Sequence, residues 1–89
     1  MSPHAFSFKL TVPNDPAAVP IIAAVAVHAV EFAAIDPARR LAFIERVQLA
    51  AEKALAIHTH THSPVEFTAA NGRLTVTIGS HAESESLPS

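Results

Sequence analysis

Three histidines alternate with threonine in the segment "AIHTHTHSP", residues 56–64, and imidazole nitrogens are common metal ligands. In a strand, His58, His60 and His62 would project to one side, as Zn²⁺, Ni²⁺ or Cu²⁺ requires. In a helix only His58 and His62 would share a face. A closed zinc site needs four ligands, so folding would have to add Glu66 or another histidine. The alternative interpretation is a polar helix end, where the helix dipole favours histidine.

The sequence gives little support to any other site chemistry. It has no cysteine and no Gly-x-Ser-x-Gly segment, so the familiar nucleophile signatures are missing. Glu45 and Glu52 would share a helix face with Arg46 and Lys53, which is typical of solvated charges. We therefore assign no catalytic residue, and we expect a protein that is not an enzyme.

Composition narrows the class of protein. The chain has 89 residues, enough for one small domain, and 49% of them are apolar, which suggests a covered surface such as a dimer interface. A net charge of −2 with six dispersed Lys and Arg does not favour nucleic acid as a partner. The first residues lack a secretory pattern, so we expect a cytoplasmic location. Pro20, His28 and Glu31 interrupt the longest apolar stretch, so we expect no membrane span.

The first half of the chain predicts one strand and two helices. "FSFKLTV", residues 6–12, alternates apolar and polar residues, as a strand with one face on a core does. Asp15 followed by Pro16 is a helix start, and that helix should run to about Ile35. Asp36 followed by Pro37 repeats the signal and begins a second, amphipathic helix.

The second half predicts a hairpin in "VEFTAANGRLTVTI", residues 65–78. Asn71-Gly72 suits a type I′ turn, and counting outward from it pairs Phe67 with Val76 on an apolar face. The order strand, helix, helix, strand, strand indicates an α/β (α+β) two-layer sandwich, with both helices on one face of a small sheet. We expect residues 1–80 to form this single domain and the acidic residues 81–89 to be a disordered tail.

This pattern resembles a known family. "FSFKLTVPNDPAAVP", the alanine-rich helix, "VQLAAEKALAIHTH" and the hairpin together look like the anti-sigma-factor serine-kinase branch of the histidine-kinase-like (GHKL) ATPases, over residues 6–78. In that family the second helix carries a Glu and, four residues later, an Asn that holds magnesium at the phosphates. Here Lys53 and Ile57 occupy those positions, or Glu52 and Ala56 if the register moves by one. The Asp-x-Gly-x-Gly segment that reads adenine is replaced by "IGSHAES".

The resemblance therefore implies a shortened, degenerate relative without a cofactor. We expect a non-catalytic regulatory or protein-interaction module in transcription regulation, acting on a protein partner or by self-association as a homodimer. One alternative is an ATP-binding serine kinase of this type, using ATP and Mg²⁺ with Glu52 and Lys53 at the nucleotide. A second alternative is a metal-binding protein that holds Zn²⁺ or Ni²⁺ on His58, His60 and His62.

Overall fold

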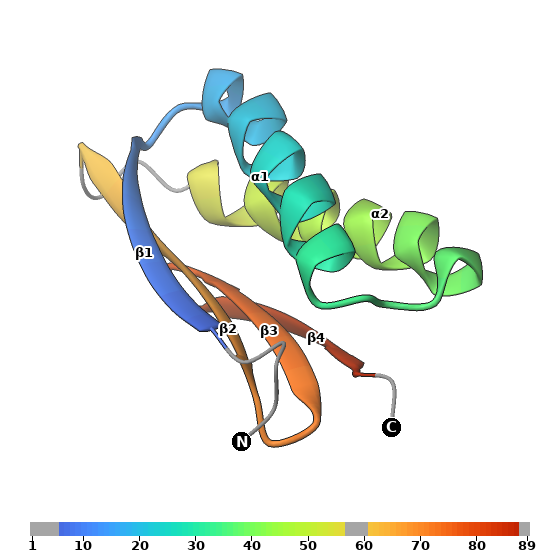
Figure 1. The fold of residues 1–89 in the computed structure, drawn as a ribbon. Coiled ribbons are helices and arrows are strands. Elements are labelled where there is room, and N and C mark those ends of the chain that lie inside the picture. Colours follow the sequence, from blue (N-terminus) through green and yellow to red (C-terminus); the bar gives the residue numbers. More distant parts are fainter. Residues whose placement is uncertain (1–5, 57–60, 88–89) are drawn as a thin grey trace.

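The computed structural model describes residues 6–56 and 61–87. It confirms the α+β two-layer sandwich, with both helices over one face of an antiparallel sheet (Figure 1). The elements in chain order are β1 (Phe6–Pro13), a 3₁₀ turn (Pro16–Ala18), α1 (Val19–Phe32), α2 (Pro37–Leu55), β2 (His62–Ala70), β3 (Arg73–Ile78) and β4 (His81–Ser86). None of the helices in these ranges is long and apolar enough to cross a membrane.

Both predicted aspartate caps are present, but Asp15 caps a short 3₁₀ turn and α1 itself begins later than expected, at Val19, whereas Asp36 caps α2. The Asp15 and Asp36 side chains accept hydrogen bonds from the backbone N–H groups of Ala17 and Ala38, at 2.9 and 3.0 Å. Pro16 opens a short 3₁₀ turn before α1, and Pro37 opens α2 directly. α1 ends at Phe32, three residues earlier than expected, because Ala34 takes a left-handed conformation with φ of 59°.

The sheet order is β1-β2-β3-β4, with every neighbouring pair antiparallel. The predicted hairpin register is confirmed, with Phe67 opposite Val76 and Ala69 opposite Leu74. Asn71 and Gly72 both have positive φ, as the two-residue type I′ turn requires. β1 and β4 are therefore the two edges of the sheet.

The fourth strand is a correction to the expected disordered tail. His81–Ser86 pairs with β3 over its whole length, from Ile78 opposite His81 to Arg73 opposite Ser86. The pairing places Glu83 and Glu85 opposite Val76 and Leu74, on the face of the sheet that the helices cover. The acidic composition of this segment is compatible with a strand because α2 supplies a partner for its carboxylates, as described below.

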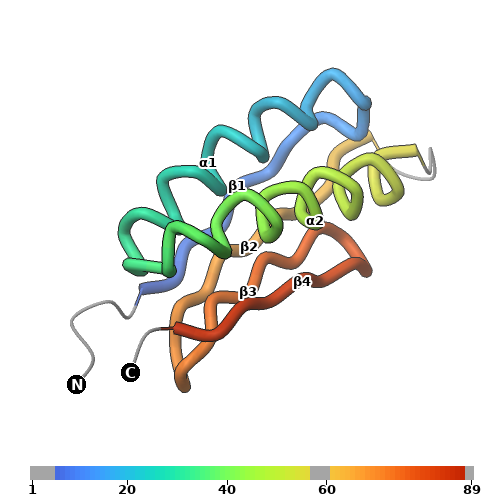
Figure 2. Tube along the Cα trace, turned by 90° about the vertical axis from the view of Figure 1, so that its right-hand side faces the viewer, coloured from blue at the N-terminus to red at the C-terminus, as the bar shows by residue number. Residues whose placement is uncertain are grey.

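The core lies between the sheet and the helices. α2 packs on β3, on β4 and on α1, and the two helices run side by side over the same face of the sheet (Figure 2). The largest fully buried side chains come from both layers: Ile22, Val30, Ile35, Phe43, Val47, Leu55, Val65, Phe67, Leu74, Val76 and Ile78. β1 departs from expectation, because Val12 is buried but Phe8 is 39% exposed.

Candidate functional site

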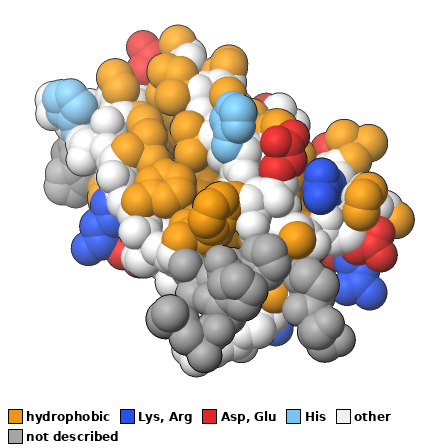
Figure 3. All heavy atoms as spheres, in the orientation of Figure 1, with side chains coloured by type: hydrophobic (Ala, Val, Ile, Leu, Met, Phe, Trp, Pro, Cys, Tyr) orange, Lys and Arg blue, Asp and Glu red, His pale blue; other side chains and the backbone are white. Residues whose placement is uncertain are grey.

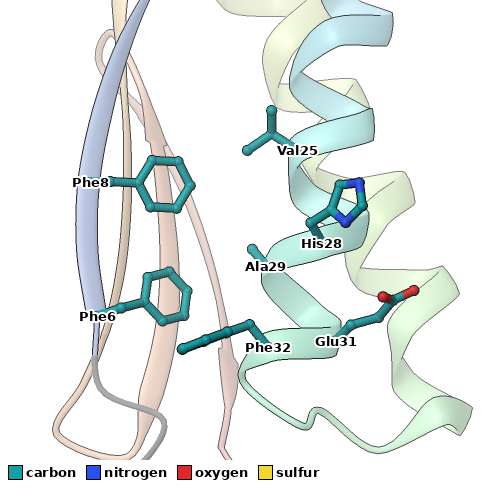
Figure 4. Close-up of a pocket in the computed structure, with 7 residues that line it drawn as sticks. All are labelled: Phe6, Phe8, Val25, His28, Ala29, Glu31 and Phe32. Atoms are coloured by element: carbon teal, nitrogen blue, oxygen red, sulfur yellow. The ribbon is translucent and has the colours of Figure 1, made fainter.

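A groove of about 620 Å³ lies between the edge strand β1 and α1 (Figure 4). Its walls are mainly apolar. The residues that line it are Phe6, Phe8, Val25, His28, Ala29, Glu31 and Phe32.

The spacing of these residues explains how they reach the groove. Phe6 and Phe8 are two apart in a strand and so face the same side. Val25, Ala29 and Phe32 have the i, i+4, i+7 spacing of one helix face, and they point toward β1 in Figure 4. The short side chains of Val25 and Ala29 leave space between helix and strand, which is why the phenylalanines of β1 are not fully covered.

Aromatic contacts tie the groove to the core. The rings of Phe6 and Phe32 meet edge to face with centroids 5.1 Å apart, and Phe8 stacks on the buried Phe67 at 5.0 Å. Phe32 is nevertheless 59% exposed. Hydrophobic side chains gather over the region where β1 and α1 face each other (Figure 3). Exposed apolar surface of this kind, in one place and in a groove, is typical of a binding site.

The polar side chains of the groove stand on its rim. His28 and Glu31 are exposed, and in Figure 4 both point away from β1. They do not converge on the space between the two walls. The groove therefore offers apolar contact area, with no acid and base pair aimed at a common point inside it.

In the part of the chain that the structure describes, no strand pairs with the side of β1 along the groove. The Asn14 N–H group donates to the Thr61 carbonyl at 2.8 Å, so the even-numbered residues of β1 bond to β2. The N–H and C=O groups of Ser7, Lys9 and Thr11 consequently point away from the sheet. These are the groups to which a further strand could bond.

The opposite edge of the sheet is covered differently. Arg46 of α2 reaches β4, where its Nε donates to Glu83 Oε1 at 3.1 Å and its Nη2 donates to the Ser84 carbonyl at 3.1 Å. Nη2 also lies 3.9 Å from Glu85 Oε2. The inward-facing carboxylates and the arginine together protect the β4 edge from pairing with another strand.

The residues considered for a nucleotide are not in the groove. Glu52 is exposed on α2, whereas Lys53 lines a different, shallow depression of about 180 Å³ together with Arg46 and His81. Arg46 is already engaged by Glu83. Neither Glu52 nor Lys53 lines the groove, and Ile57 lies outside the described residues.

The histidine tract is described only in part. His58 and His60 lie outside the described residues, and His62 is the exposed first residue of β2. Its Nδ1 lies 3.1 Å from the Thr61 hydroxyl oxygen, within hydrogen-bond distance. Over residues 6–56 and 61–87, no group of three His, Cys, Asp or Glu side chains is placed to hold a metal.

Sequence reasoning missed the groove. The alternation in residues 6–12 predicts which face of β1 is apolar, but not how closely a helix covers that face. One signal was available, because Phe32 is a large apolar residue at the end of a helix made chiefly of alanine and valine.

Comparison with protein-family models, with curated proteins and with solved structures finds no match to this chain.

Proposed function

We propose that the protein is a non-catalytic regulatory or protein-interaction module, and that its binding surface is the groove between β1 and α1. The observation that carries this proposal is the combination of exposed Phe8 and Phe32 with an open backbone edge beside them. Apolar rings supply affinity by leaving water, and strand backbone groups fix the orientation of a polypeptide.

The character of the groove favours a polypeptide over a reacting substrate. A catalytic site needs polar groups that converge on the reacting atoms, and the polar groups His28 and Glu31 point away from β1 here. A phosphate ligand is favoured by cationic side chains, and the residues that line the groove include no Lys or Arg. The apolar lining suits side chains of another protein.

We further propose that the module acts in the cytoplasm and in transcription regulation. The first point is supported by a chain without cysteine, and so without the disulfides on which many small secreted domains depend. The second is supported only by the resemblance in pattern to anti-sigma-factor serine kinases.

Site-specific photocross-linking in the native cells tests the proposed surface. A benzophenone amino acid replaces Phe32 in one variant and Leu41 in a matched control, since Leu41 is also a large, exposed apolar residue but lies on α2 outside the groove. We expect an adduct with a defined polypeptide at position 32 and none at position 41. Adding Phe8→Glu to the first variant should remove the adduct. No adduct at position 32, or the same adducts at both positions, would contradict the proposal.

Calorimetric titration with ATP and Mg²⁺ tests the rival function. The proposal predicts no heat of binding at concentrations up to about 1 mM, the weak end of the affinity scale. Micromolar binding that is lost on Lys53→Ala would support the nucleotide-binding alternative and overturn the interaction module.

A further inference from the structure

We propose that the groove is occupied by a second copy of this chain, whose β1 pairs antiparallel with β1 of the first across a two-fold axis at Phe8. The two four-stranded sheets would then form one continuous sheet. This inference rests on the proposed function, because it names the partner of the same groove.

The contrast between the two sheet edges points to β1. An edge strand is ordinarily protected by short length, by inward-facing charge or by a covering side chain. β4 has these protections in Glu83, Glu85 and Arg46, whereas β1 is eight residues long and its inward face carries Phe6, Phe8 and Leu10. Within residues 6–56 and 61–87, β1 is thus the edge without such protection, and the groove lies along it.

Charge does not oppose the approach of two β1 strands. Lys9 is the one charged residue of β1, and its Nζ lies 3.4 Å from Glu66 Oε2 on the neighbouring strand. This pair is on the outer face of the sheet, away from the groove. Within β1 itself, therefore, the one charge that two copies would bring together has a partner on its own sheet.

The register follows from symmetry and from the backbone directions. A two-fold axis perpendicular to the sheet must pass through a pair of identical residues. An axis at Lys9 would set two like charges directly opposite each other, which is unfavourable. An axis at Leu10 would leave Phe6 without an apolar partner and set Ser7 against Pro13, which has no N–H group.

An axis at Phe8 avoids the like charges and gives the apolar residues apolar partners. Phe8 meets Phe8 of the second copy, and Phe6 meets Leu10, so each partly exposed apolar residue of β1 gains an apolar neighbour. Ser7 and Lys9, whose backbone groups point outward, become the hydrogen-bonded pair, giving four N–H···O=C bonds across the axis.

The exposed phenylalanine rings account for part of the area that a stable dimer buries. At about 200 Å² for each phenylalanine side chain, Phe8 and Phe32 at 39% and 59% exposure leave roughly 200 Å² of ring surface in water. A stable interface covers about 800 Å² on each partner. The rings would supply about a quarter of that area. The remainder would have to come from the paired strands and from the other residues that line the groove.

The first test compares Lys9→Pro with Lys9→Ala by sedimentation velocity of the full chain, from about 1 to 500 µM. Both variants remove the charge, but only proline removes the outward N–H group, while bonds to β2 are left in place because Lys9 does not make them. We expect wild type and Lys9→Ala to dimerise alike, and Lys9→Pro to associate at least about 30-fold more weakly, since two hydrogen bonds are lost and its ring faces the second strand. Circular dichroism verifies that Lys9→Pro is folded.

The second test locates the axis. The chain has no cysteine, so each single-cysteine variant reports one position. Residues at the axis form a non-hydrogen-bonded pair with Cα atoms about 4.5 Å apart, a separation that a disulfide spans. We expect Phe8→Cys to form a disulfide-linked dimer under mild oxidation faster than Leu10→Cys or Ser7→Cys. Faster linkage of Leu10→Cys would overturn the axis at Phe8.

The outcomes separate this inference from the proposed function. A wild-type chain that stays monomeric to 500 µM, or a Lys9→Pro variant that dimerises as tightly as Lys9→Ala, overturns the second copy as occupant. If position 32 then cross-links to a different polypeptide, the interaction module stands with another partner. If position 32 gives no adduct either, both proposals fail.

Discussion

Replacing Arg46 with alanine should destabilise the protein and loosen β4 in particular. Arg46 is the side chain through which α2 holds the acidic strand, by bonds of 3.1 Å to Glu83 and to the Ser84 carbonyl. Its guanidinium carbon also lies 5.4 Å from the centroid of the Phe43 ring. Removal leaves two carboxylates on the helix-facing side of the sheet without this cation.

The expected magnitude comes from these contacts. Each hydrogen bond contributes about 0.5–1.5 kcal/mol, and the lower half applies because the Arg46 and Glu83 side chains are 41% and 34% exposed, so water screens the pair. The contact with Phe43 adds about 0.5 kcal/mol. We therefore expect Arg46→Ala to lower the free energy of unfolding by about 1.5–2.5 kcal/mol. Arg46→Lys keeps the charge but loses the planar set of guanidinium N–H donors, and should lower the free energy of unfolding by about half as much.

Urea unfolding, followed by circular dichroism at one fixed protein concentration, measures both variants. The concentration is held fixed because self-association would add to apparent stability. Amide hydrogen exchange should show the largest loss of protection in β4 and little change in β1. A change below about 0.3 kcal/mol in Arg46→Ala, with unaltered exchange in β4, would refute the conclusion that Arg46 holds this strand.

Three further substitutions test the packing and the turns. Phe67→Ala should cost about 3–5 kcal/mol in urea unfolding because Phe67 is fully buried; a cost below 1 kcal/mol would mean that the sheet centre is not the core. Ala34→Gly should raise the stability by about 0.5–1 kcal/mol, since φ at this position is 59° and glycine adopts it freely; a lower melting temperature would contradict this. Gly72→Ala should lower the stability by about 1 kcal/mol through backbone strain alone, because φ is 76° and no atom lies within 4 Å of the added Cβ. An unchanged unfolding midpoint would contradict the type I′ turn.

The hairpin and the helix starts could be predicted because each depends on neighbouring residues. A two-residue turn at Asn71 and Gly72 fixes the register of every pair that follows, so the alternation on both sides could be tested against itself. The aspartate-proline pairs at positions 15 and 36 likewise act within one helical turn. The two-layer arrangement then followed, since the apolar sheet face had only the helices to cover it.

β4 could not be predicted from local signals. Serine and glutamate are weak strand formers, and the segment has the composition of a solvated tail. Besides its pairing with β3, it is held by a contact with Arg46, 37 residues away from Glu83 in the sequence. Such a pairing becomes visible only when the helix is placed over the sheet.

The groove escaped prediction for a similar reason. The pattern of β1 shows that Phe6 and Phe8 share a face, but the exposure of that face depends on how far α1 stands from it. The distance between α1 and β1 depends on the packing of α1 on α2, and the small side chains of Val25 and Ala29 do not fill the space between them. The nucleotide and metal interpretations used residue types and spacing alone, and they do not point to the groove, which neither Glu52 nor Lys53 lines.

The topology of the sheet also determines the order in which it can assemble. β2, β3 and β4 follow one another through tight turns, so they can pair as soon as that part of the chain exists. β1 must instead close a loop that contains both helices before Phe6 can meet Ala69. We expect β1 to join the sheet last during folding and to be the first strand to detach. The place that it vacates on β2 would accept the same strand from another molecule, so the chain carries a built-in route to domain swapping at high concentration.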